Sequence, residues 1–163
     1  IRLMDDAIDD DIRALYQEVI LDHGKSPRNF RHPDDAPLEA HGNNPLCGDK
    51  LTVYVRLGED KKIEDAAFEG RGCAISIASA SMMTGILRGK SVAEMERLFG
   101  AFHTMCTGEG EIDAAAAEEF EDDIDKLKVL SGVKQFPMRV KCATLAWHTI
   151  NAAILGEQDA STE

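Results

Sequence analysis

Three of the four cysteines lie where a loop is predicted to meet a regular element. Cys47 comes just before a strand, Cys73 opens a helix after Glu-Gly-Arg-Gly, and Cys142 lies near the start of the last helix. At a helix N-terminus, unpaired backbone N–H groups and the helix dipole stabilise a thiolate and lower the pKa of the thiol. These three thiols are therefore candidates for metal binding or for nucleophilic chemistry.

Positive charge accompanies two of these cysteines, although the chain as a whole is acidic. Arg71 precedes Cys73 by two residues, and Arg139 and Lys141 precede Cys142. The whole chain carries 30 acidic residues against 18 basic ones, a formal net charge of -12. A nearby cation favours the thiolate form of cysteine, so this local bias supports the same chemistry.

Asp49 follows Cys47 by two residues in the turn-rich stretch NNPLCGDK. Three thiolates and this carboxylate would give four ligands of mixed sulfur and oxygen type. Zinc accepts such a tetrahedral set, and iron–sulfur clusters are held mainly by cysteine thiolates. The sequence has no Cys-x-x-Cys or Cys-x-x-His pair, so a metal site would have to assemble from three separate segments. The alternative is a set of unrelated buried thiols at the ends of helices and strands.

The remaining cysteine and the histidines are weaker candidates. Cys106 and His103 lie at the end of a predicted helix and would extend a metal set, but the interpretation we favour for Cys106 is a small apolar residue in the core. His148 follows Cys142 by six residues on the same predicted helix, which puts the two on different faces. His41 is close to Cys47 in sequence, and we expect it to be solvated.

Composition indicates one globular domain spanning residues 1–163, with flexible ends at 1–4 and 157–163. Hydrophobic residues make up 44% of the 163, enough for a core. The acidic charge disfavours binding to nucleic acid or to an anionic membrane. No apolar run approaches the ~20 residues that span a bilayer, and the acidic start of the chain is unlike a secretory signal. We therefore expect a cytoplasmic protein with reduced thiols.

Hydrophobic periodicity predicts an α+β fold in which helices pack on one face of a small antiparallel sheet of about three strands. A capping box at Ser91 and Glu94 marks the start of one helix. We expect residues 156–163 to form a frayed tail. The predicted elements are, in chain order, a helix over 5–23, strands over 38–44, 51–57 and 61–70, and helices over 74–89, 91–105, 111–132 and 140–155.

Four segments in this order resemble the SufU-type proteins of bacterial iron–sulfur cluster biogenesis, relatives of the IscU scaffold in the IscU/NifU N-terminal superfamily. The resemblance extends from about Leu15 to Ala153, except for the acidic region from Thr107 to Asp125. The four segments are LYQEVILDHGKSPRNF, NNPLCGDKLTV, FEGRGCAISIASASMMT and RVKCATLAW.

The resemblance implies a SufU/IscU-like fold and a zinc site formed by Cys47, Asp49, Cys73 and Cys142. It implies that Cys47 accepts persulfide sulfur from a SufS-type, pyridoxal-phosphate-dependent cysteine desulfurase, and that a downstream iron–sulfur scaffold receives it. In the family a histidine of the desulfurase replaces this cysteine on zinc. Arg139 matches a family arginine that supports the exchange. The activity implied is that of a zinc-dependent sulfurtransferase.

Two departures separate the chain from IscU-type scaffolds. Lys141 stands where those proteins carry a histidine before the third cysteine, which removes one potential cluster ligand. An extra helical segment, roughly Glu109 to Val129, precedes the last motif, as in SufU-type proteins. Both features favour sulfur transfer. Two alternatives remain open: a scaffold that assembles a transient [2Fe-2S] cluster or holds iron on the same ligands, and an adaptor in which zinc is purely structural.

Overall fold

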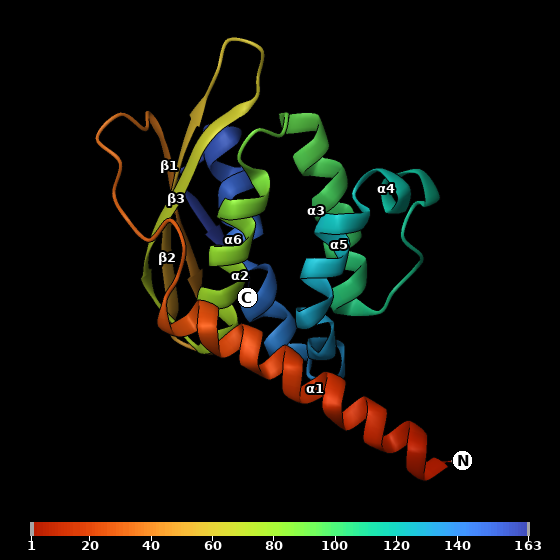
Figure 1. Ribbon diagram of the computed structural model, residues 1–163. Coiled ribbons are helices and arrows are strands. Elements are labelled where there is room, and N and C mark those ends of the chain that lie inside the picture. The colour runs from red at the N-terminus through yellow and green to blue at the C-terminus, as the bar shows by residue number, and fades with distance from the viewer. Residues whose placement is uncertain (1, 163) are drawn as a thin grey trace.

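A four-stranded mixed sheet forms one side of the molecule, and the helices pack on one of its faces (Figure 1). The computed structural model describes residues 2–162, with side chains from residue 13 onward. The strands are β1 (Leu38–Asn44), β2 (Asp49–Leu57), β3 (Ile63–Arg71) and β4 (Asp159–Ser161). Their order in the sheet is β3-β2-β1-β4, with β1 and β3 antiparallel to β2. The predicted α+β class and the three predicted strands are confirmed.

The fourth strand corrects the prediction of a purely antiparallel, three-stranded sheet. β4 pairs in parallel with β1, and the N–H of His41 donates to the carbonyl of Gln158 at 2.8 Å. The prediction of a frayed tail is therefore wrong at residues 159–161. Three residues are too few to show a strand pattern, so only the edge offered by β1 orders them. The flexible ends predicted at 1–4 and 157–163 fall partly, at residues 1 and 163, outside the described residues.

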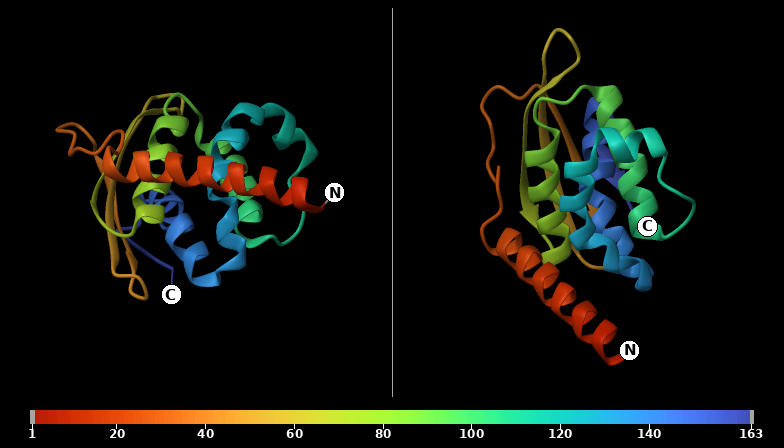
Figure 2. Two further views of the ribbon diagram at one scale, coloured as in Figure 1. Left: turned by 60° about the horizontal axis from the view of Figure 1, so that its bottom comes forward. Right: turned by 45° about the vertical axis from the view of Figure 1, so that its right-hand side comes forward.

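The helices form two layers behind the sheet (Figure 2). In the first layer α6 packs on β1 and β2, and α2 packs on β3. α3 lies behind α6, and the capping box predicted at Ser91 and Glu94 is present at its start. α1 lies across α2 and η1. The helices are α1 (Arg2–Lys25), α2 (Ala74–Leu87), α3 (Val92–Thr107), α4 (Ala114–Glu119), α5 (Glu121–Leu127), the 3₁₀ helix η1 (Lys128–Gln135) and α6 (Pro137–Ile154).

The segment predicted as one helix over 111–132 is instead divided into α4, α5 and η1. Its apolar residues recur at helical spacing, which is why the pattern reads as continuous. The break comes at Phe120, whose backbone leaves the helical conformation at φ -110° and ψ 29°. The ring of Phe120 is buried under the guanidinium of Arg97 at 5.3 Å, so tertiary packing overrides the local pattern.

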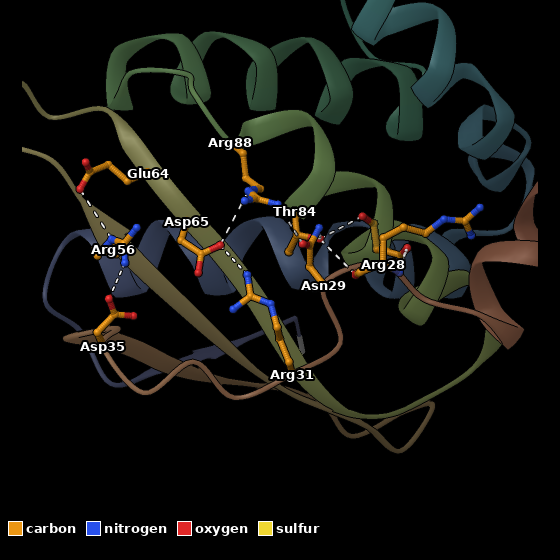
Figure 3. A network of polar contacts seen from close by, with 10 residues as sticks. Arg28, Asn29, Arg31, Asp35, Arg56, Glu64, Asp65, Thr84 and Arg88 are labelled. Atoms are coloured by element: carbon orange, nitrogen blue, oxygen red, sulfur yellow. Dashed lines mark hydrogen bonds and ion pairs between the residues drawn. The ribbon is translucent and has the colours of Figure 1, made fainter.

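The connection between α1 and β1 is fastened to the sheet and to α2 by a polar network (Figure 3). Arg31 pairs with Asp65 of β3 at 2.6 Å, and Arg88 approaches the same carboxylate at 3.7 Å. The amide of Asn29 donates to the hydroxyl of Thr84 at 3.1 Å. The hydrogen bond with Arg31 lowers the pKa of Asp65. These contacts fix the connection against the body of the molecule.

α6 begins three residues earlier than predicted, because Pro137 occupies its first turn, a position that suits proline. Cys142 is consequently inside the helix, beyond the unpaired N–H groups of its first turn. Between residues 2 and 162, no helix combines the length and apolar character needed to cross a membrane.

Candidate metal centre

Cys47, Asp49 and Cys142 converge at one end of the sheet, and we call these three residues the Cys–Asp cluster. Each offers one ligand atom, and these atoms all lie within 4.8 Å of one another. The two sulfurs are 3.2 Å apart. Asp49 and Cys142 are fully buried, whereas Cys47 is half-buried. The cluster therefore combines two enclosed donors with one donor that solvent reaches.

The β1–β2 hairpin brings Cys47 and Asp49 together. Asn44 at the end of β1 faces Asp49 at the start of β2 in the ladder, so only four residues connect the strands. Gly48 has φ +70°, a left-handed conformation that glycine adopts without strain. The N–H of Cys47 donates to the carbonyl of Asn44 at 3.3 Å. Because α6 packs across β1 and β2, Cys142 reaches the same point.

The carboxylate of Asp49 is held from two sides. Its Oδ1 accepts the backbone N–H of Cys73 at 2.9 Å, and its Oδ2 accepts the amide of Asn44 at 3.2 Å. Gly72 lies so close that a Cβ there would stand 2.6 Å from Oδ1. Asp49 is thus fixed in orientation, and each oxygen keeps a further lone pair for another partner.

Cys73 lies beside the Cys–Asp cluster at the N-cap of α2. Its sulfur accepts the N–H of Ser76 at 3.5 Å. The pKa of Cys73 is lowered to about 6, mainly by a hydrogen bond from Cys142 and further by Ser76 N–H. The lowered pKa predicted for Cys73 is present, but the helix N-terminus contributes less to it than the hydrogen bond with Cys142 does. The mutual distances that define the cluster do not extend to Cys73.

For Cys142 the same prediction is wrong. Its hydrogen bond to Cys73, together with burial, raises the pKa of Cys142. This thiol lies within α6 rather than at a free helix end, so it gains no support from unpaired N–H groups. The neighbouring Cys73 and burial therefore favour the protonated form of Cys142.

Arg139 places a cation next to these thiols. It precedes Cys142 by almost one helical turn of α6 and is exposed. The pKa of Arg139 is raised, first by its hydrogen bond with Cys142 and then by the charge of Cys73. Arg139, one of the three cations expected from the sequence, therefore lies at the site.

The other candidates lie elsewhere. Cys106 is fully buried in the core, and burial raises its pKa to about 12, which bears out the packing interpretation. His103 and His148 are neighbours on α3 and α6, with ring centroids 6.5 Å apart. Burial lowers the pKa of His148. His41 is exposed and hydrogen-bonded to Thr52 at 3.0 Å.

Asn44 is the residue of this site that sequence reasoning missed. It is fully buried, and its amide reaches both Asp49 and Cys142. Burial alternates along β1, with Ala40, Gly42 and Asn44 facing inward. The sequence did carry a signal for Asn44: it is a polar residue at the last inward-facing position of a strand, next to the loop that holds candidate ligands.

The donor chemistry of the site fits zinc. Two cysteine sulfurs and one carboxylate oxygen lie within 4.8 Å of one another, close enough to bind one ion, and a third thiol with a lowered pKa lies beside them. Zinc binds such mixed sulfur and oxygen sets in tetrahedral geometry. The buried carboxylate of Asp49 has no lysine or arginine ion pair among the described residues, so a bound cation would supply positive charge beside it.

Comparison with known proteins places these features in a family. The sequence matches the family described as "NifU-like N terminal domain" over residues 15–115. It is 40% identical over 147 residues to the zinc-dependent sulfurtransferase SufU of Bacillus subtilis (strain 168), covering 89% of this chain and 92% of that protein. It is also 40% identical over 143 residues to the iron–sulfur cluster assembly scaffold protein IscU of Streptococcus pyogenes serotype M1, covering 88% and 84%.

A solved structure supports the same relationship. The crystal structure of FiSufU from Fervidobacterium islandicum AW-1, described as a scaffold protein for the SUF system, superposes with a TM-score of 0.74 at 34% identity. The match covers 84% of this chain and 94% of that one. The architecture of sheet and helices is therefore shared over nearly the full length of that protein.

Proposed function

The chain belongs to the family of NifU-like N-terminal domains, and we propose that it is a zinc-dependent sulfur acceptor in iron–sulfur cluster assembly. In this proposal Cys47 takes persulfide sulfur from a cysteine desulfurase of the SufS type and passes it to a downstream scaffold. The protein acts as one domain in the cytoplasm, where thiols remain reduced. The name of the Bacillus subtilis relative supports both zinc and sulfur transfer.

The observation that carries the proposal is the unequal exposure within the Cys–Asp cluster. Cys47 is half-buried on a loop, while Asp49 and Cys142 are fully buried. A sulfur acceptor needs one thiol that a partner protein can reach. The other groups need only hold the site together.

We propose Cys47, Asp49, Cys73 and Cys142 as the zinc ligands. Bound there, zinc would keep its thiol ligands deprotonated at neutral pH. Asp49 serves as an oxygen ligand held by its two N–H donors, not as an acid or base. Cys73 contributes a thiol whose pKa is already lowered to about 6.

Sulfur transfer then requires a single displacement at Cys47. The Cys47 thiolate attacks the outer sulfur of the donor's persulfide, and the sulfur–sulfur bond of the donor breaks. The donor cysteine leaves as a thiolate, and Cys47 becomes the persulfide, so charge and electrons balance. The guanidinium of Arg139, next to the thiols, stabilises the anionic sulfur on either side of this step.

The surface around the site suits docking of a partner. Leu46, Phe136 and Met138 are large apolar residues with 54–60% of their surface exposed. Leu46 adjoins Cys47, and the other two begin α6 before Arg139. Exposed apolar residues beside a reactive group are typical of a protein–protein interface.

Desulfurase turnover tests the proposal. The zinc content of the purified protein is measured, and cysteine desulfurase activity is assayed with and without it. We expect one zinc per chain and strong stimulation that is lost in Cys47→Ala. Cys106→Ala is the matched control, because this buried thiol lies outside the site, and it should stimulate like the wild type. Absence of stimulation by the wild-type protein would refute the proposal.

The IscU relative supports a second candidate, a scaffold for a transient [2Fe-2S] cluster on the same residues. Anaerobic reconstitution separates the two. A cluster that forms stably and passes intact to an apo-ferredoxin favours scaffolding, whereas persulfide on Cys47 without a stable cluster favours sulfur transfer.

A further inference from the structure

The side chain of Asn44 connects two of the four proposed ligands, Asp49 and Cys142, and has no hydrogen bond with Cys47 among the described residues. We propose that Asn44 is a positioning residue that keeps Asp49 and Cys142 in place while Cys47 leaves the site. This inference rests on the proposed function for the meaning of the Cys47 movement. The contacts that carry it belong to the chain itself.

One amide group makes both connections. Nδ2 of Asn44 donates to Oδ2 of Asp49 at 3.2 Å and to Sγ of Cys142 at 3.5 Å. An asparagine amide nitrogen carries two hydrogens, so both bonds form at once. Asn44 comes from β1, Asp49 from β2 and Cys142 from α6. A single buried side chain therefore ties three elements together at the site.

The orientation of this amide is fixed by chemistry. Exchanging its oxygen and nitrogen would point Oδ1 at the carboxylate of Asp49, acceptor against acceptor. In the observed orientation Oδ1 is buried without a hydrogen-bond partner among the described residues. A buried acceptor without a partner is unfavourable. The side chain is nevertheless held in this orientation, which indicates that the two N–H hydrogen bonds of Asn44 outweigh the cost of its unpaired Oδ1.

Cys47 lacks equivalent support. Its sulfur contacts only the sulfur of Cys142 among the hydrogen bonds of the described residues. Its backbone N–H makes a long bond of 3.3 Å to the carbonyl of Asn44. A Cβ added at the next residue, Gly48, would meet no atom within 4 Å. Asp49, in contrast, has a donor on each oxygen. Asn44 thus holds Asp49 and Cys142 in place, whereas Cys47 is free to move away from them.

Outer contacts of this kind set the strength of metal sites, because they orient the groups that bind the ion. Loss of such a contact typically weakens metal binding by about 10- to 100-fold. The proposal therefore predicts that Asn44 acts on zinc retention and on the order in which the thiols become accessible. Neither quantity depends on a desulfurase.

The test compares Asn44→Ala and Asn44→Leu with Asn43→Ala. Leucine has the shape of asparagine without its N–H donors, so it fills the space but restores neither bond. Asn43 is the exposed neighbour on the opposite face of β1 and serves as the control. The rate of zinc release from the folded protein to a chromophoric chelator is measured, with the absorption spectrum of the cobalt-substituted protein as a second readout.

We expect zinc release to be about 10- to 100-fold faster in both Asn44 variants, with an altered cobalt spectrum and an unchanged rate in Asn43→Ala. If Asn44 only fills space, Asn44→Leu should release zinc at the wild-type rate. If Asn44 only supports the fold, its variants should have a lower melting temperature and an unchanged rate of zinc release. Either of these results overturns the proposal.

A measurement on the wild-type zinc protein completes the test, because it needs no variant to fold. Limited alkylation with iodoacetamide, followed by mass spectrometry, should label Cys47 first and Cys142 later. Labelling of Cys142 before Cys47 would overturn the proposal. Failure of the proposed function would appear separately, as a wild-type protein that does not stimulate a desulfurase.

Discussion

A methyl group added at Gly72 should damage the site without disturbing the fold around it. Its Cβ would lie 2.6 Å from Oδ1 of Asp49, about 0.8 Å closer than the 3.4 Å at which ordinary contact begins. Gly72 does not adopt a left-handed conformation, so alanine is not strained there by its backbone. The collision with Asp49 is therefore the main effect that Gly72→Ala introduces, beside a lesser one with Oγ of Ser76 at 3.2 Å.

The size of the effect follows from the bond that must give way. To clear the methyl group the carboxylate has to move by nearly an ångström, which takes Oδ1 away from the N–H of Cys73, now at 2.9 Å. Hydrogen bonds to charged groups contribute about 1.5–3 kcal/mol. If the whole free energy of this hydrogen bond is lost from zinc binding, zinc affinity falls by roughly 10- to 100-fold.

Competition with a chelator measures this loss, and Gly85→Ala is the matched control. Gly85 lies on the exposed side of α2, and its Cβ would meet no atom within 4 Å. That substitution should raise the free energy of unfolding by roughly 1 kcal/mol through helix propensity and leave zinc affinity unchanged. If Gly72→Ala binds zinc within about twofold of the wild type, Asp49 is not a ligand whose orientation matters, and the reasoning fails.

Two further predictions concern the fold. Burial and the neighbouring His103 lower the pKa of His148, so below about pH 6.5 the unfolded chain binds more protons than the folded one and stability rises with pH. His148→Gln should flatten this rise in urea denaturation between about pH 5 and 7, and parallel profiles would contradict the assignment. Deletion of residues 157–163 removes β4 and the 2.8 Å bond from His41 to Gln158, and should cost about 1–2 kcal/mol; an unchanged melting temperature would restore the frayed-tail prediction.

Most elements of the fold follow from local pattern, because their chemistry is local. The alternation of β2 and the capping box at Ser91 depend on residues within a few positions of each other. The exceptions depend on contacts that a sequence window does not contain. Phe120 breaks a helical pattern because its ring is buried under Arg97. Asp159–Ser161 becomes a strand only because β1 offers an edge.

The site divides in the same way. Residue types alone left a metal site and unrelated buried thiols both open, and the family resemblance implied a shared site of Cys47, Asp49, Cys73 and Cys142. The ligand atoms of Cys47, Asp49 and Cys142 lie within 4.8 Å of one another. The pKa shift of Cys142 was predicted in the wrong direction, because the main cause of the shift is a hydrogen bond with Cys73, which lies 69 positions away in the chain. Asn44 escaped notice because its importance lies in two long-range hydrogen bonds.

Of the three thiols among the proposed ligands, Cys47 is the one whose departure the topology would tolerate best. A metal that joins Asp49, Cys73 and Cys142 closes chain segments of 24 and 69 residues, and closing such segments stabilises the folded chain. Cys47 lies two residues from Asp49 on the same hairpin, so its bond to the metal closes no additional segment. Its departure removes one metal–sulfur bond and leaves β2, α2 and α6 joined. Loss of Cys73 or Cys142 would instead release a whole element from the site. The thiol that a partner can reach is therefore also the one whose release the fold tolerates.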